Sequence, residues 1–87
     1  MVSMTQTLKV PDSLAGRLEL VGRALHGDRW QRPLATALGV SHVALSRWVK
    51  GGGTHINVDA ALFKLLRARA REIDATVLAL LDFYSKR

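Results

Sequence analysis

Residues 31–48 read QRPLATALGVSHVALSRW, and they contain the clearest structural pattern in the chain. Apolar residues recur at helical spacing on both sides of one glycine, Gly39, which follows the last apolar residue of the first segment, where a chain leaving a helix often turns left-handed. Ser41 can then cap a second helix, because its hydroxyl can accept a bond from a backbone N–H of the first turn. The pattern predicts helices at about 30–38 and 41–50 joined by a tight turn.

The first of these helices carries a small residue, Ala35, between two core leucines, Leu34 and Leu38. A small side chain suits a place where two helices cross steeply, since a larger one would push their axes apart. Pro33 restricts the start of the helix, because its ring would clash with the carbonyl four residues earlier in a longer helix. We therefore expect the helix to begin no earlier than about Trp30.

The second helix is predicted to have one buried and one outward side. With Leu45 at the centre of the buried face, a rotation of about 100° per residue places Ser41, Trp48 and Val49 in the inner arc. The outward residues, with His42 at their edge, are His42, Val43, Ser46, Arg47 and Lys50.

The outward residues have side chains suited to the edges of DNA bases. Arg47 can present a bidentate fork to guanine, Val43 can touch a thymine methyl group, and His42 and Ser46 can donate or accept hydrogen bonds. Lys50 is better suited to a phosphate. The helix is therefore a candidate reader of the major groove, although His42 and Ser46 can also be solvated surface residues.

The matching pattern, Q..LA..LGVS followed by a hydrophobic residue, Ser and Trp, resembles the helix-turn-helix of Cro and cI-like (XRE-type) repressors. The resemblance implies phosphate contact by Gln31 and base contacts by His42, Val43, Ser46 and Arg47. It also implies a sequence-specific transcription regulator, more a repressor than an activator. The full set of expected phosphate contacts is Gln31, Arg32, Ser41, Lys50, Thr54 and His55, the last two also being compatible with an exposed loop.

Charge supports a polyanionic partner, here double-stranded DNA. Thirteen Lys and Arg against seven Asp and Glu leave a formal net charge of +6 in 87 residues, a length that suits one small domain. The region 23–55 holds five basic residues, Arg23, Arg29, Arg32, Arg47 and Lys50, against one acid, Asp28.

Catalysis has little support. Three scattered histidines, two glutamates and no cysteine make no recognisable metal cluster, and we expect neither a cofactor nor an enzyme. The absence of cysteine fits a reducing cytoplasm. The N-terminal residues lack the apolar core of a signal peptide, and the longest aliphatic run, 75–81, is too short to cross a bilayer, so no membrane partner is expected.

Ahead of the motif, Ser13 can cap a helix at about 13–26 that carries Leu14, Leu18, Val21 and Leu25 on one face. Residues 1–12 are expected to form an extended arm or short strand. The combination of a strand-like segment and this helix also resembles a ribbon-helix-helix regulator, which remains an alternative. Overall we expect an all-α domain with its DNA-binding core at 13–58.

After three consecutive glycines and a short strand or loop at 54–58, a long helix is predicted at 59–85. It contains neither Gly nor Pro, and a heptad-like seam predicts packing and dimerisation. The alternative is a break near Asp74, with the last segment folding back. The seam is Phe63, Leu66, Ala70, Ile73, Val77, Leu80 and Tyr84.

A homodimer is expected because one small reader buries little DNA surface, whereas a twofold dimer reads two half-sites. Two other functions remain open: an antitoxin-like subunit that also grips a protein partner, and a nucleoid-type protein that binds DNA without sequence preference. The arginines Arg67, Arg69 and Arg71 are expected to form a solvated face or, alternatively, a second phosphate-binding surface.

Overall fold

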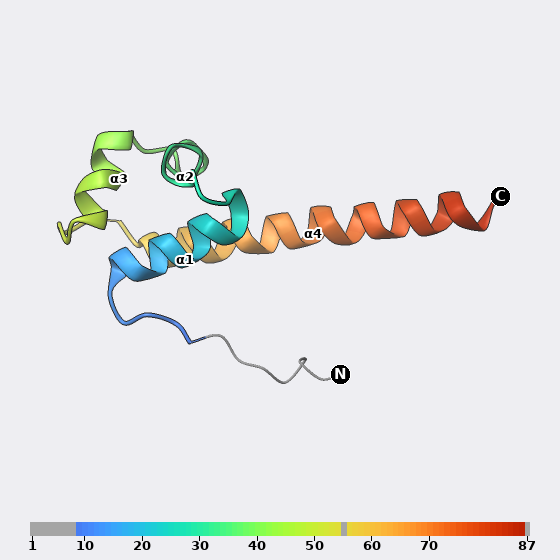
Figure 1. Cartoon of the computed structure of the whole chain (residues 1–87), viewed down its shortest axis with the longest axis horizontal. Coiled ribbons are helices and arrows are strands. Elements are labelled where there is room, and N and C mark those ends of the chain that lie inside the picture. Colours follow the sequence, from blue (N-terminus) through green and yellow to red (C-terminus); the bar gives the residue numbers. More distant parts are fainter. Residues whose placement is uncertain (1–8, 55, 87) are drawn as a thin grey trace.

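The computed structural model describes residues 9–54 and 56–86. Over these residues the chain is all-helical, with four helices and no strand. In chain order the helices are α1 (Leu14–His26), α2 (Gln31–Leu38), α3 (His42–Val49) and α4 (Val58–Ser85). Helices α1 to α3 gather at one end of the molecule, and α4 runs past them (Figure 1). The predicted all-α architecture is confirmed.

Short polar side chains begin three of the helices. The side chains of Ser13, Ser41 and Asn57 accept hydrogen bonds from backbone N–H groups at Gly16, Ala44 and Ala60, each at 3.0 Å. These bonds satisfy N–H groups that have no partner within the helix. Ser41 therefore caps α3 as predicted, but it is exposed rather than part of the buried arc, because a cap residue lies outside the helical turn.

Helices α2 and α3 are joined by a turn at Gly39, whose φ of 75° and ψ of 28° are left-handed. The N–H of Val40 donates to the carbonyl of Ala35 at 3.0 Å, which closes the end of α2. Pro33 lies in the first turn of α2, where its missing N–H leaves no bond unmade. The predicted start, turn and cap of this segment are confirmed.

The core lies where the four helices meet. Leu18, Leu34 and Leu45 are fully buried, one from each of the first three helices, and α4 adds Val58 and Leu62. Leu14, Leu25, Leu38 and Val40 pack against this cluster from its edges. The sides of α1, α2 and α3 that were predicted to be buried face this core, and Ala35 is buried with them.

A close approach between α1 and the start of α2 depends on Gly22. A Cβ atom added at Gly22 would lie 2.3 Å from Cε3 of Trp30, whose side chain is buried. Only a residue without a side chain leaves room for the indole ring against this turn of α1. This contact was not predicted from the sequence, where Trp30 marked only the earliest start of α2.

Helix α4 is continuous, so the alternative break near Asp74 is wrong. Its 28 residues contain good helix formers and neither Gly nor Pro. The molecule measures 53 × 29 × 22 Å, and the far end of α4 projects beyond the other helices (Figure 1). Every described residue from Arg67 onward is exposed. We call residues 67–85 the uncovered half of α4.

An ion pair ties the start of α4 to α1. The guanidinium of Arg17 donates to both carboxylate oxygens of Asp59, at 2.7 and 3.1 Å, and also to the carbonyl of Asp12 at 2.7 Å. The hydrogen bond from Arg17 holds the pKa of Asp59 below its ordinary value. The contact orients the first turn of α4 along α1.

Two sequence predictions fall partly outside the described residues. The proposed N-terminal arm or strand at 1–12 is described only from Lys9, and Lys9 and Val10 are exposed and lie in no helix or strand. In the predicted strand or loop at 54–58, the described residues form no strand. Val58 is already the first residue of α4.

Candidate functional site

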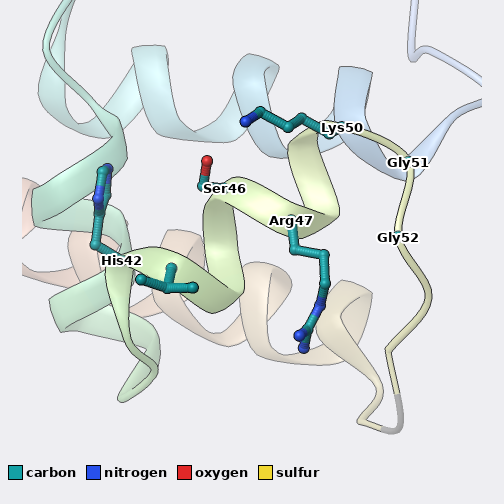
Figure 2. A pocket seen from close by; sticks show the side chains of 7 residues that line it. His42, Ser46, Arg47, Lys50, Gly51 and Gly52 are labelled. Atoms are coloured by element: carbon teal, nitrogen blue, oxygen red, sulfur yellow. The ribbon is translucent and has the colours of Figure 1, made fainter.

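Helix α3 turns its apolar side inward and its polar side to solvent. Leu45 and Trp48 are buried, against α1 and α2. The opposite side opens into a shallow pocket, which Figure 2 views from outside with α1 and α4 behind α3. The residues that line it are His42, Val43, Ser46, Arg47, Lys50, Gly51 and Gly52.

All four residues predicted to contact bases line this one pocket. His42 lies at the α2 end of the helix and Arg47 nearer the glycine loop (Figure 2). Val43 is 73% exposed, so its methyl groups are open to contact from outside. We call the residues His42, Val43, Ser46, Arg47 and Lys50 the α3 face.

The glycine loop after α3 packs directly beside Arg47. Gly51 has a φ of 97°, and the N–H of Gly52 donates to the carbonyl of Arg47 at 2.9 Å. A Cβ atom at Gly52 would lie 2.6 Å from Cγ of Arg47. The loop therefore limits where the Arg47 side chain can lie. No role at the site was predicted for these glycines, and the run of three was the available signal for a tight turn.

A second hollow adjoins the first at the start of α2. His42 borders both hollows, so the start of α2 and the α3 face form one continuous surface. Gln31 and Arg32, two predicted phosphate contacts, belong to it. The lining residues are Arg23, Asp28, Arg29, Trp30, Gln31, Arg32 and His42.

The charges on this surface are of two kinds. Arg23 is held by Glu19 at 2.7 Å and by Asp28 at 3.0 Å. Arg29 and Arg32 are exposed and form no ion pair with a described residue, and neither do Arg47 and Lys50 on the α3 face. Cations without a protein partner are available to an external anion. Arg29 was counted in the basic stretch of the sequence but not assigned to the site.

Two further predicted phosphate contacts, Ser41 and Thr54, do not line either of these two hollows. Ser41 is exposed, and its hydroxyl oxygen caps α3. The Thr54 hydroxyl accepts from the N–H of Ile56 at 3.2 Å, and Thr54 shares a third hollow with Arg47 and Trp48. His55 lies outside the described residues. Ser41 and Thr54 thus border the α3 face, and each has a structural bond of its own.

The predicted dimerisation residues do not share one environment. Leu66 packs partly against the core of its own chain, whereas Phe63 is exposed. Ala70 and the rest of the seam lie on the uncovered half of α4, namely Ile73, Val77, Leu80 and Tyr84.

Comparisons with protein-family models, with curated proteins and with solved structures found no match for this chain. Among the described residues, no group of three or more His, Asp or Glu side chains is arranged to hold a metal ion. None of the helices in the described ranges is long and apolar enough to cross a membrane.

Proposed function

We propose that this chain is a sequence-specific, double-stranded DNA-binding transcription regulator that acts as a homodimer in the cytoplasm. The observation that carries the proposal is the α3 face, where His42, Val43, Ser46 and Arg47 line one exposed pocket of a helix anchored by its other side. A short helix held in this way can enter the major groove. The Cro and cI-like resemblance favours repression.

In this proposal Arg47 reads a guanine through its two-pronged guanidinium, and Val43 contacts a thymine methyl group. His42 and Ser46 donate to or accept from neighbouring base edges. Around them, Lys50, Arg29 and Arg32 neutralise phosphates, and Gln31 contacts a phosphate at the start of α2. Thus the α3 face supplies specificity and the flanking cations supply a salt-sensitive part of the affinity.

A second candidate function is favoured by one observation, the apolar uncovered half of α4. An exposed apolar surface of this extent is typical of an interaction site. It would suit an antitoxin-like subunit that binds a protein partner through α4 and its own operator through α3. Both candidates require specific DNA binding.

The test is a selection of binding sites from a randomised duplex library at physiological salt. We expect a palindromic motif bound at least about a thousandfold more tightly than random DNA. The logarithm of affinity should fall with the logarithm of salt concentration by about 0.9 for each phosphate neutralised. Uniform binding to all sequences would instead indicate a nucleoid-type protein, and absence of binding would reject both candidates.

Substitution of Arg47 sharpens this test. Arg47→Ala should cost about 1–3 kcal/mol on the selected site and much less on random DNA, because the lost contact is to a base. Arg71→Ala, an arginine on the uncovered half of α4, is the matched control and should leave site preference unchanged. Equal losses on selected and random DNA would make Arg47 a phosphate contact.

A further inference from the structure

The apolar stripe of α4 continues beyond the part of the molecule that covers it. Leu62 is 3% exposed and lies against the core, whereas Leu80, about five full helical turns further on, points to the same side and is 46% exposed. Ile73 and Tyr84 lie within about 40° of that direction. One stripe is thus buried by the chain's own α1 and α2 in its first half and bare in its second.

We propose that the bare stripe is covered by the same stripe of a second copy of this chain, running antiparallel. Val77 then lies opposite the partner's Leu80, and Ile73 lies opposite the partner's Tyr84. The proposal specifies the dimer included in the proposed function, but it does not depend on DNA binding.

Steric exclusion decides the direction. The bare stripe faces the same side of α4 as the part that α1 and α2 cover, so a parallel partner would bring both sets of covering helices into the space between the two copies of α4. An antiparallel partner avoids this overlap, because its α4 occupies the open space beyond α1 and α2 (Figure 1). Each uncovered half then fills the space beside the other.

The register follows from the length of the uncovered half and the spacing of its apolar residues. Leu66 is the last residue of α4 that packs on its own core, so the partner helix has to end before it reaches this point. The residues Ile73, Val77, Leu80 and Tyr84 follow one another in steps of four, three and four, which read the same in both directions. Antiparallel pairing therefore places each of the four opposite another apolar side chain.

Charge has a smaller influence than steric overlap on the direction of the partner helix. In this register no ion pair forms between Glu72 and the partner's Lys86, because both residues lie well off the stripe, by about 80° and 120° from Leu80. Each pairs within its own chain, with Arg69 and with Asp82. A parallel pair would instead bring Arg69 near Asp74 of the other copy. An exposed ion pair contributes little to affinity, whereas two folded segments cannot occupy one volume. Steric overlap therefore outweighs charge in setting the direction of the partner helix.

The apolar residues of the bare stripe also favour a second copy of this chain as the partner. The exposed apolar residues at 73, 77, 80 and 84 form one continuous stripe on a chain of only 87 residues. Small domains bury a modest share of their surface, and association is a common way to add to it. Because the stripe is complementary to itself, a second copy of the chain is sufficient to bury it.

Disulfide cross-linking tests the direction, because the chain contains no cysteine. Ile73→Cys and Tyr84→Cys are prepared separately, mixed in equal amounts, oxidised with glutathione disulfide and weighed by non-reducing mass spectrometry. We expect the mixed Ile73→Cys/Tyr84→Cys dimer to predominate. The two copies of Cys at 73 would be about 16 Å apart, too far for a disulfide. Self-linked dimers of each single variant would overturn the antiparallel arrangement.

Sedimentation equilibrium tests whether a second copy of the chain covers the bare stripe, without any engineered cross-link. Val77→Asp and Leu78→Asp are matched variants, since the two residues are adjacent but Leu78 lies about 100° further around the helix. We expect a wild-type dimer, an unchanged Leu78→Asp dimer, and a dissociation constant raised about a hundredfold or more by Val77→Asp, which buries an unpaired charge. Fluorescence of Trp30 and Trp48 should stay native in both.

A wild-type chain that remains monomeric at high micromolar concentration overturns the proposal, and so does equal weakening by both variants. Neither experiment contains DNA. A cross-linked antiparallel dimer that shows no site preference would therefore reject the proposed function and uphold this inference. Selective DNA binding by a monomer would reject this inference and the homodimer, and would uphold only the DNA-reading role of the α3 face.

Discussion

The two halves of α4 carry the same kind of surface but have different surroundings. In the first half, Val58 and Leu62 are buried against α1 and α2, whereas in the second half Ile73 and Leu80 stand about half exposed on the same side of the helix. The residue types do not distinguish the halves. An apolar stripe therefore indicates which side of a helix will be covered, but not which part of the protein or which partner covers it.

The largest expected effect comes from truncating one leucine in each half. Leu62→Ala should lower the free energy of unfolding by about 2–5 kcal/mol, because it leaves a cavity in the core. Leu78→Ala, at a residue that is 67% exposed, should change it by no more than about 0.5 kcal/mol. Urea denaturation at one protein concentration measures both. Similar losses in the two variants would contradict the division of α4 into a covered and an uncovered half.

The next effect tests the helices that cover the first half. Gly22→Ala places a Cβ atom against the indole of Trp30, which has to move, and should cost about 1–3 kcal/mol. The matched control is Gly53→Ala, where an added Cβ meets no atom within 4 Å and which should be neutral within about 0.5 kcal/mol. Urea denaturation followed by tryptophan fluorescence measures both. A tolerated Gly22→Ala would show that α1 and α2 can separate without loss.

The smallest effect concerns the ion pair at the start of the covered half. The bond from Arg17 lowers the pKa of Asp59, so the pair stabilises the fold above the ordinary carboxyl pKa of 3.8, and this stabilisation is lost as the pH falls through the lowered value. Asp59→Asn should therefore be less stable than wild type at pH 6, with the difference vanishing in stronger acid.

Unfolding curves collected from pH 6 down to pH 2 measure this difference. Asp74→Asn, in the uncovered half, is the matched control, because Asp74 forms no ion pair with a described residue. A difference between wild type and Asp59→Asn that is constant across this range would show that the Arg17 contact does not stabilise the folded state.

Much of the fold could be predicted because its signals are local. Ser13 and Ser41 cap helices, Gly39 forms the left-handed turn, and Pro33 lies in a first turn, each by chemistry that acts within a few residues. The prediction that Ser41 lies in the buried arc was wrong, because Ser41 is exposed. A rotation of 100° per residue applies within a helix, and the cap lies outside it.

The candidate site was predictable in part for the same reason. One helical face brings His42, Val43, Ser46 and Arg47 together, and periodicity shows this without tertiary information. The approach of Gly52 to Arg47, and the joining of Arg29 and His42 into one surface, involve segments that meet only after the chain has folded. Contact between the α3 face and DNA bases remains a prediction.

Local signals along the chain set where the helices begin and end and which sides of them are apolar, because capping, turn geometry and periodicity act over a few residues. The close approach of Gly22 to Trp30, and the extension of α4 beyond the helices that cover its first part, arise only when the helices pack together. Those properties depend on which surfaces meet across the chain. Packing between distant segments is set by shape and volume, which no local pattern records.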